Sequence, residues 1–475
     1  MVAVIGGGIV GSLIAREINK YVEDVYLFEA KNGIGTGVTK ANSGILHGGY
    51  DDPPGSLRAQ LCYKGNRLYD EISRELSIEV KRIGSHVVAL GESELAVIDE
   101  LEEKATRNNV KEYRILNRDE LFEMEPNLSE NALSSFYCPI AGITEPWEVA
   151  MQAARSIELN GGRVFKGKRL VEVAKKDGKF ELSFEDGSTY TADLVINAAG
   201  LYADEVAKLF GDDVPKIFPI KGEYFLFGKD VRYVNSVIFP MPSELTKGCL
   251  VIPTVDGGFL AGPTAHGVQS KQDFSTTRDG LAEVKEKTLK LIPSLDFSRN
   301  VVKTFAGLRP ESGGKDFYID VGTDNVIHVS GIRSPGLTAA PAIAKYVTEY
   351  LIEEKLHINL EKRQNYIEHV EKVSHFVETD FDYWSKAIEE DPEAGQIICF
   401  CNKVTKQEIK EAIRNGARTI DEVKFATRAS FGECQGSFCT SKILKIICDE
   451  TGLRPQDVLL NEKGSWIIDS EVRSI

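Results

Sequence analysis

The sequence has no hydrophobic segment of the length that a membrane requires. None of its apolar runs approaches the ~20 residues that a helix needs to cross the hydrocarbon core, so no transmembrane helix is predicted. No basic leader follows Met1, because the chain enters an apolar strand at once, and no secretory signal is predicted. We therefore expect a cytoplasmic protein, and attachment to the inner face of the membrane through a partner is compatible with the sequence.

Positive charge is scarce as well. The 475 residues include 57 Lys and Arg against 72 Asp and Glu, a formal net charge of −15. Such a chain repels a phosphate backbone, and the sequence contains no run of basic residues that would form a local positive patch. General nucleic-acid binding is therefore excluded. A small anionic substrate would need particular Arg or Lys side chains inside a cleft. The length predicts about three domains of ordinary size.

The first thirty residues predict a strand–turn–helix–strand unit. Residues 2–5 form an apolar run that enters a turn with glycine at positions 6, 7, 8 and 11. A helix over 12–20 and a second strand over 25–28 follow. This order is typical of a dinucleotide-binding site, although a glycine-rich turn by itself would be weak evidence.

Each glycine of the turn has a mechanical role in such a site. Gly6 allows the tight turn, Gly8 lets the backbone approach a pyrophosphate, and Gly11 permits close packing of the helix on the strand. Glu29 ends the second strand, with Ala30 after it, and can accept hydrogen bonds from the two hydroxyls of an adenosine ribose. The same carboxylate would repel a 2′-phosphate. The unit therefore predicts FAD or NAD rather than NADP, and an ordinary tight turn is the alternative.

The next segment, 31–50, contains six glycines and two threonines. This composition indicates backbone laid against a ligand rather than a regular element. His47 lies in this segment between small residues that would leave its ring accessible. A lone histidine is more often structural than catalytic, so its role depends on the context.

Residues 42–49 (Asn-Ser-Gly-Ile-Leu-His-Gly-Gly), followed by 54–57 and Leu61-Cys62, supply that context. They resemble the segment under the flavin in FAD-dependent 2-hydroxy-acid and glycerol-3-phosphate dehydrogenases of the D-amino-acid oxidase superfamily. Residues 197–204, 305–310 and 331–338 match further motifs of that group in the same order. The resemblance selects FAD over NAD. The cofactor contacts that it implies, besides those of the first unit, are Asn42, Ser43, Gly44, Leu46, Val171, Ala199, Gly200, Gly307, Gly336, Leu337 and Thr338.

The resemblance implies an α/β fold, in which a Rossmann-like FAD-binding domain carries an inserted β-rich substrate domain. A meander of three strands over 163–168, 170–175 and 179–185 is expected near the adenine, and Val301–Arg309 is expected to return to the FAD-binding domain. The amphipathic pattern of residues 63–76 predicts a helix there. The boundaries expected from the sequence are 1–85, 140–214 and 298–355 for the FAD-binding domain, 86–139 and 215–297 for the substrate domain, 356–394 for a helical connector, 395–455 for a small helical C-terminal domain and 456–475 for a tail.

Five of the eight cysteines crowd this C-terminal region. In an intracellular chain such a group indicates metal binding before disulfides. Cys399 and Cys401 form a Cys-x-Cys pair, and Cys434 and Cys439 form a Cys-x4-Cys pair. Zinc ribbons prefer Cys-x2-Cys knuckles, so neither spacing fits a zinc ribbon well. Cys448 lies inside a predicted helix and is expected to be a packed thiol.

Helix signals surround these pairs. Thr405 and Glu408 have the spacing of a capping box, as have Thr419 and Glu422, and a third helix is expected over 440–451. With these helices the cysteines resemble the 2Fe-2S domain of bacterioferritin-associated ferredoxins, which implies that Cys399, Cys401, Cys434 and Cys439 hold a 2Fe-2S cluster. Zinc, disulfides and free thiols are the alternatives.

The resemblance implies oxidation of sn-glycerol 3-phosphate to dihydroxyacetone phosphate. His47 would remove the C2 hydroxyl proton while C2 gives a hydride to flavin N5. Arg309, with Ser334 and Arg333, would bind the phosphate, although an arginine is usually a plain surface cation. A flavin accepts two electrons and a cluster carries one, so the electrons would pass from the flavin to the cluster and on to an electron-accepting protein subunit.

Three other functions are compatible with the sequence. L-2-hydroxyglutarate dehydrogenases share the segment near the flavin, and only the substrate anion differs. Dehydrogenases of amino acids such as proline, or of opines, also combine this fold with a cluster domain. The third of these functions is that of a non-catalytic electron carrier or redox sensor. Such a protein has no need of an inserted β-domain or of an accessible histidine beside the flavin.

Overall fold

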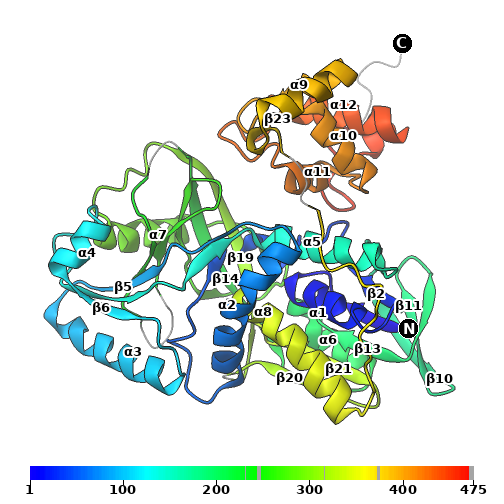
Figure 1. Cartoon of the computed structure of the whole chain (residues 1–475), viewed down its shortest axis with the longest axis horizontal. Helices are drawn as coiled ribbons and strands as arrows, with labels where there is room; N and C mark the ends of the chain where they lie inside the picture. Colours follow the sequence, from blue (N-terminus) through cyan, green and yellow to red (C-terminus); the bar gives the residue numbers. More distant parts are fainter. Residues whose placement is uncertain (230–231, 243–247, 315, 372–374, 470–475) are drawn as a thin grey trace. The chain divides into compact units, whose positions relative to one another are not determined.

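The computed structural model describes residues 1–229, 232–242, 248–314, 316–371 and 375–469. The chain divides into two compact units (Figure 1). The first comprises Met1–Ala30 and Ile34–Val370, and the second comprises Lys31–Gly33 and Glu371–Ile475. No helix in the described ranges is long and apolar enough to span a membrane.

A six-stranded sheet forms the centre of the first unit, in the order β20-β21-β13-β1-β2-β9. Its strands are parallel except for β20 at one edge. The sheet is buried on both faces, which explains the unbroken apolar runs of β1 and β13. The strands are β1 (Val2–Ile5), β2 (Val25–Phe28), β9 (Arg163–Phe165), β13 (Leu194–Asn197), β20 (Tyr318–Val321) and β21 (Val326–Ser330).

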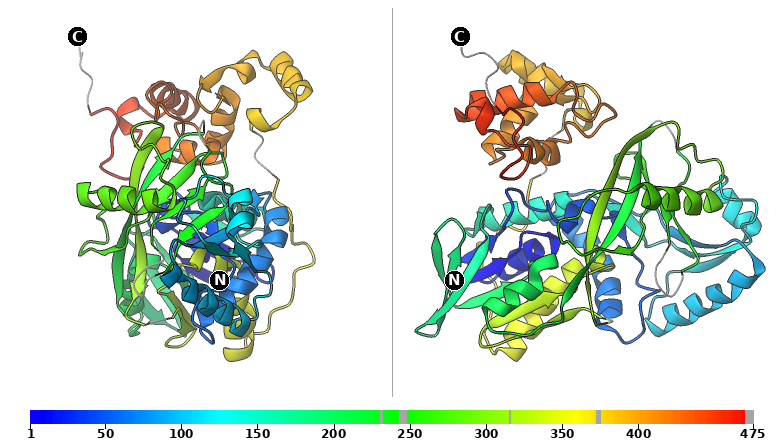
Figure 2. Two further views of the ribbon diagram at one scale, coloured as in Figure 1. Left: turned by 90° about the vertical axis from the view of Figure 1, so that its left-hand side faces the viewer. Right: turned by 180° about the vertical axis from the view of Figure 1, so that it is seen from behind.

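Helices cover one face of this sheet and an antiparallel meander covers the other. The apolar faces of α1 (Ile9–Asn19), α5 (Pro146–Leu159) and α8 (Gly336–Lys345) share one buried core with β1 and β13. The meander packs its own aromatic side chains against the second face and projects beside the N-terminus (Figures 1 and 2). Helix α6 (Ala203–Leu209) contributes to that second core. The predicted α/β architecture is thus confirmed.

One strand of the predicted meander was assigned wrongly. The meander consists of β10 (Leu170–Lys176), β11 (Lys179–Phe184) and β12 (Thr189–Ala192), whereas the segment from 163 pairs with β2 in the main sheet. Phe165 stacks on Phe28 with ring centroids 5.1 Å apart. This apolar contact favours the central sheet for β9, and the third meander strand follows the turn at Gly187 instead.

A second sheet of nine strands follows the order β18-β14-β17-β16-β15-β5-β7-β6, with β19 paired to β14. β19 (Val301–Ser312) runs antiparallel to β14 (Ile217–Phe227) along nearly its whole length. The segment 301–309, which the sequence analysis assigned to the FAD-binding domain, therefore hydrogen bonds within this second sheet. The other strands are β5 (Ser85–Ala89), β6 (Arg114–Asn117), β7 (Ser134–Cys138), β15 (Val237–Pro240), β16 (Leu250–Pro253), β17 (Phe259–Gly262) and β18 (His266–Gly267).

Helices also pack on this second sheet. They are α3 (Leu95–Arg107), α4 (Arg118–Met124) and α7 (Arg278–Leu291), the last of which the sequence analysis did not predict. A small sheet, β3-β8-β4, lies at residues Ile45–Leu46, Gly142–Thr144 and Val80–Lys81. Short helical turns occur at Val38–Ala41, Glu92–Glu94, Gly200–Tyr202, Phe376–Glu378, Pro392–Gly395 and Pro455–Asp457, and a π-helix at Tyr346–Lys355 continues α8.

Helix α2 (Leu57–Glu75) begins six residues before its predicted start at Tyr63. The Ser56 hydroxyl accepts a hydrogen bond from the Ala59 N–H, and the Asp316 carboxylate accepts the N–H groups of Leu57 and Arg58. These acceptors satisfy the first turn, and Asp316 comes from a loop far along the chain. Further along α2, a Cβ on Gly65 would lie 2.1 Å from the Thr338 carbonyl oxygen, so the backbones of α2 and α8 touch directly.

The second unit contains the helices that the capping boxes predicted. α10 (Lys406–Arg414) and α11 (Ile420–Thr427) begin after Thr405 and Thr419, and both capping boxes are complete. α12 (Thr440–Thr451) is the third helix, and β22 (Ile397–Cys399) pairs with β23 (Val404–Thr405). The predicted helical connector was wrong in its first part, because 357–370 contains no helix, whereas its second part contains a helical turn at Phe376–Glu378 and α9 (Phe381–Glu390).

Candidate active site and cluster site

The glycines of the first turn are required by close backbone contacts. Gly6 has φ of +111°, and a Cβ there would lie 2.4 Å from the Ala198 carbonyl oxygen. A Cβ on Gly11 would lie 1.9 Å from the Gly6 oxygen, so α1 packs directly on the end of β1. Gly8 differs, because a Cβ there would meet only the Thr39 hydroxyl, at 3.3 Å. The space above Gly8 thus admits a ligand.

The N-terminus of α1 presents backbone N–H groups at this position. Its N-cap, Gly8, has no side chain to satisfy them, and the Thr39 hydroxyl accepts the Ile9 N–H at 3.0 Å. The positive end of the helix dipole favours an anion there. Glu29 lies beside the turn, where its carboxylate accepts the Gly7 N–H at 2.7 Å. The turn, the helix end and this carboxylate fit the pyrophosphate and the ribose of FAD.

Several of the other predicted cofactor residues come after strands of the central sheet. Ala199 and Gly200 follow the end of β13 after one intervening residue, and Gly336, Leu337 and Thr338 form the first turn of α8, which is the next helix after β21. Ligands of open α/β sheets bind outside the carboxyl ends of the strands. Val171 lies at an irregularity in the pairing of β10 with β11, and its side chain is exposed.

The backbone of His47 is clamped from two sides. Its N–H donates to the Thr338 hydroxyl at 2.9 Å, which ties it to the first turn of α8. Its carbonyl oxygen accepts a hydrogen bond from Asn66 Nδ2 of α2 at 2.9 Å, and the Cys62 thiol lies 3.9 Å away. Both helices therefore determine where the imidazole stands.

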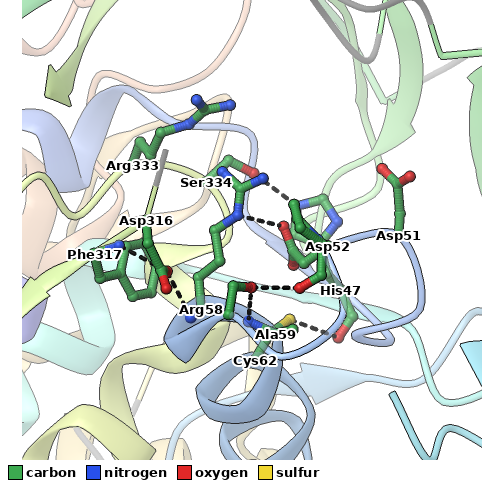
Figure 3. A network of polar contacts seen from close by, with 12 residues as sticks. His47, Asp51, Asp52, Arg58, Ala59, Cys62, Asp316, Phe317, Arg333 and Ser334 are labelled. Carbon is green, nitrogen blue, oxygen red and sulfur yellow. Dashed lines mark hydrogen bonds and ion pairs between the residues drawn. The ribbon is translucent and has the colours of Figure 1, made fainter. Parts of the chain in front are cut away.

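The His47 ring is half-buried and has a hydroxyl neighbour (Figure 3). Ser334 Oγ lies 3.4 Å from Nε2, and the Phe239 ring lies 5.9 Å from the imidazole, centroid to centroid. The chain after His47 is also fixed, because Asn108 Nδ2 donates to the Asp52 carbonyl oxygen at 2.8 Å. The structure thus brings together two predicted site residues, His47 and Ser334.

Arg309 lies on β19, opposite Ile220 of β14. Its guanidinium donates to the Thr264 carbonyl oxygen at 3.3 Å and contacts the Tyr224 hydroxyl, which also contacts Ser43. Burial raises the pKa of Tyr224, and the Arg309 charge offsets part of this rise. Through Tyr224, Arg309 is connected to the predicted flavin-contacting segment 42–49. Gly307 on the same strand lies against Ala41, whose oxygen would be 2.0 Å from an added Cβ.

Arg333 is less available for an anion than the sequence suggested. Its Nη1 forms an ion pair with Glu311 at 2.8 Å, so its positive charge is already matched. A substrate anion would have to share this guanidinium with a carboxylate. Arg333 and Ser334 are neighbours in the chain and lie together at the site (Figure 3). Arg309 instead comes from β19 of the second sheet.

A third arginine near this site, Arg58, was not predicted from its sequence position. Its side chain is only 12% exposed and its Nε lies 3.2 Å from the buried Asp52 carboxylate. Figure 3 shows the Arg58 side chain extending from the first turn of α2 toward Ser334. The signal that could have found it was its position directly after residues 54–57, which already carried the resemblance.

The four cysteines of the Cys-x-Cys and Cys-x4-Cys motifs lie as two neighbouring pairs in the second unit. The Cys399 and Cys439 thiols hydrogen bond to each other, and Cys401 interacts with Cys434 in the same way. The hydrogen bond from Cys439 lowers the pKa of Cys399 to about 6, and the same bond raises the pKa of Cys439. The thiolate is the form that binds metals.

Two pairs of thiols suit a two-iron cluster better than a single ion. Within the described ranges no three His, Cys, Asp or Glu side chains converge on one metal-ion position. In a 2Fe-2S cluster with four cysteines each iron takes two thiolates. The paired arrangement fits that cluster and does not provide the single tetrahedral site that zinc prefers.

Comparison with known proteins agrees with both parts of this description. Residues 1–350 match the family model of FAD-dependent oxidoreductases, and residues 397–448, which include the four paired cysteines, match that of BFD-like [2Fe-2S]-binding domains. A glycerol 3-phosphate dehydrogenase of Caloramator mitchellensis is 38% identical over 100% of this chain and 99% of its own length. An L-2-hydroxyglutarate dehydrogenase of Escherichia coli is 29% identical over 72% of this chain and 91% of its own.

A solved structure is similar as well. The L-α-glycerophosphate oxidase of Mycoplasma pneumoniae, with FAD bound, superposes with a TM-score of 0.72 and 26% identity. It covers 78% of this chain and 97% of its own length. The fold and the two cofactors that the sequence predicts, FAD and a 2Fe-2S cluster, are thereby supported on separate parts of the chain.

Proposed function

The chain belongs to the family of FAD-dependent oxidoreductases, and from this premise we propose that it oxidises sn-glycerol 3-phosphate to dihydroxyacetone phosphate. The observation that carries the proposal is His47, clamped between α2 and α8 and accompanied by Ser334, with arginine side chains on neighbouring elements. The similarity to the C. mitchellensis dehydrogenase supports it, because that similarity extends over both units.

The residues divide between base and anion binding. His47 accepts the proton of the C2 hydroxyl through Nε2, while Ser334 Oγ, 3.4 Å from that atom, orients the ring or the substrate hydroxyl. FAD, when bound, supplies the acceptor for the hydride that leaves C2. Proton removal has to accompany hydride loss, because a protonated carbonyl is a poor product.

Arg309 is the leading candidate for the phosphate. Its planar guanidinium suits a phosphate oxygen pair, and its contacts to Thr264 and Tyr224 hold it in place. Among the residues that the structure describes, no carboxylate pairs with it as Glu311 pairs with Arg333. Arg58 also extends toward Ser334 (Figure 3), but its charge is matched by the buried Asp52 carboxylate, as that of Arg333 is by Glu311. Arg333 assists only if it leaves Glu311.

The first test is anaerobic bleaching of the flavin absorbance. Glycerol 3-phosphate, L-2-hydroxyglutarate and L-proline are offered separately, and rapid bleaching by glycerol 3-phosphate alone is expected, because only the true substrate places its reacting carbon correctly. Rapid bleaching by L-2-hydroxyglutarate would transfer the same residue roles to a carboxylate substrate. Bleaching by proline would contradict the role of His47, since an amine needs no such base.

Replacing Arg309 with Gln is expected to raise the KM for glycerol 3-phosphate by about 10–100-fold, since a hydrogen bond to a charged group contributes about 1.5–3 kcal/mol. The rate of bleaching by saturating glycerol, which lacks the phosphate, should hardly change. Arg299→Gln serves as the matched control, because Arg299 is an exposed cation paired with Asp296. Equal losses with both substrates would mean that Arg309 supports the fold rather than the phosphate.

We further propose that electrons pass from the flavin to the cluster and then to a partner protein. A substrate gives up two electrons together, whereas the cluster carries one at a time, so the presence of both cofactors in one chain supports a dehydrogenase that delivers electrons singly.

A further inference from the structure

Two large aromatic side chains of the second unit point away from its core. Phe400 is 67% exposed and Phe438 is 72% exposed. The unit has a well-formed core of its own, which includes Ile409, Val423 and Ile447, so these two rings are not needed to build it. Exposed aromatic residues in a group are typical of surfaces that bind a partner.

Both rings lie next to the cluster ligands. Phe400 stands between Cys399 and Cys401, and Phe438 directly precedes Cys439. Cys399 and Cys439 are buried, whereas Cys401 is exposed. A cluster held by the two thiol pairs would therefore approach the surface at Cys401, on the segment that carries Phe400.

The charge around these residues is positive, unlike that of the chain as a whole. Lys442 Nζ lies 5.2 Å from the centre of the Phe400 ring, and Lys403 is exposed two residues after Cys401. Glu433 is the one acidic residue within three positions of the four cysteines in sequence. Residues 395–455 carry ten Lys and Arg against seven Asp and Glu, whereas the second unit as a whole carries 15 against 19, so the positive charge is local to this part of the unit.

We propose that this surface, which we call the cluster face and define by Phe400, Phe438, Cys401, Lys403 and Lys442, docks an acidic protein that carries a one-electron redox centre. An apolar centre with a charged rim is the usual anatomy of a protein interface. Complexes for electron transfer are small and transient, and charge complementarity raises their rate of association. The acidic partner is favoured because the rim is basic.

Electrons would pass from the cluster to the docked protein one at a time. The reduced cluster loses one electron to the oxidised centre of the docked protein, which leaves as the reduced carrier, and a second carrier takes the second electron of each oxidised substrate. This inference rests on the proposed path from the flavin through the cluster. It does not depend on the identity of the substrate.

The test uses the full-length holoprotein, reduced with dithionite and freed of excess reductant under anaerobic conditions. The probes are cytochrome b5, an acidic haem protein, and cytochrome c, a basic one. The rate constant for cytochrome b5 reduction is expected to fall as ionic strength rises, because salt screens the attraction. Lys442→Glu should lower that rate constant about tenfold at low salt and raise the one for cytochrome c.

The double variant Phe400→Ser/Phe438→Ser should lower the cytochrome b5 rate constant about tenfold even at high salt. Phe381→Ser is the matched control, since Phe381 is 84% exposed on α9 and lies outside the cluster face. Cluster absorbance and thermal unfolding are measured for every variant, so that loss of the cluster is distinguished from loss of docking. Line broadening of the haem signals of oxidised cytochrome b5 on mixing reports binding without any turnover.

Any of three results would overturn the inference. One is a double variant that matches Phe381→Ser in both rate and line broadening. Another is a rate constant for cytochrome b5 reduction by the wild-type protein that does not change with ionic strength. A Lys442→Glu variant that reduces cytochrome b5 faster than the wild type would overturn it as well. Failure of glycerol 3-phosphate to bleach the flavin would refute the proposed substrate and leave these measurements unaffected, because dithionite supplies the electrons.

Discussion

His47→Asn is expected to lower the rate constant of flavin reduction by glycerol 3-phosphate ~10²-fold or more, with the FAD content unchanged. Removing a general base typically costs a factor of about 10²–10⁴. Asn is close in size to the imidazole and cannot take the C2 proton. The measurement is anaerobic stopped-flow absorbance of the flavin with the variant and the wild type.

The structure explains why this substitution should leave the fold intact. The bonds that hold position 47 use its backbone N–H and carbonyl oxygen, with Thr338 and Asn66 as partners. The side chain contributes a contact to Ser334 at 3.4 Å and a ring contact to Phe239. Ser334→Ala is a useful companion variant, because it removes the hydroxyl and keeps the base. A His47→Asn protein that reduces its flavin at the wild-type rate would refute the assignment of the base.

Cys434→Ala is expected to abolish the 2Fe-2S cluster while flavin reduction by substrate continues. The remaining Cys401 cannot hold its iron alone, since each iron of such a cluster takes two thiolates. Iron content and visible absorbance should fall to the background of the flavin. Reduction of one-electron protein acceptors should then fall by at least tenfold.

Cys448→Ala provides the matched control for this variant. Cys448 is a half-buried thiol inside α12, and burial raises its pKa. It lies outside the two thiol pairs, so its removal should leave the iron content unchanged. A Cys434→Ala protein that retains stoichiometric iron, or a Cys448→Ala protein that loses it, would reassign the cluster ligands.

The features that the sequence predicted well are those determined by near neighbours in the chain. Thr405 with Glu408, and Thr419 with Glu422, satisfy helix N-termini within one turn, and both capping boxes are present. The first strand–turn–helix–strand unit is likewise a local arrangement, and its strands have the predicted bounds. Here the spacing of residue types contains the needed information.

The features that the sequence did not predict depend on distant partners. Helix α2 starts early because the carboxylate of Asp316, which is 259 residues from Leu57 and 258 from Arg58 in the chain, accepts its first N–H groups. β9 joins the central sheet through Phe28, and the strand at 301–312 joins the second sheet through β14. Periodicity within a segment cannot identify such partners.

The candidate site shows the same division. His47, Ser334 and Arg309 could be named from motifs, but the ion pair of Arg333 with Glu311 and the burial of Arg58 beside Asp52 arise from packing. The contact from Tyr224 to both Arg309 and Ser43 joins a strand of the second sheet to the turn after Ala41. Those contacts alter which cation is available, and no spacing in the sequence reveals them.

The contact at Gly65 bears on how this enzyme can change over evolutionary time. Because a Cβ there would lie 2.1 Å from the Thr338 oxygen, the separation of α2 and α8 is determined by backbone atoms rather than by side chains. Substitutions that enlarge or shrink neighbouring core residues are therefore expected to change the distance between the two helices little. The backbone of His47, which hydrogen bonds to Thr338 of α8 and Asn66 of α2, is therefore expected to keep its position when neighbouring core side chains change.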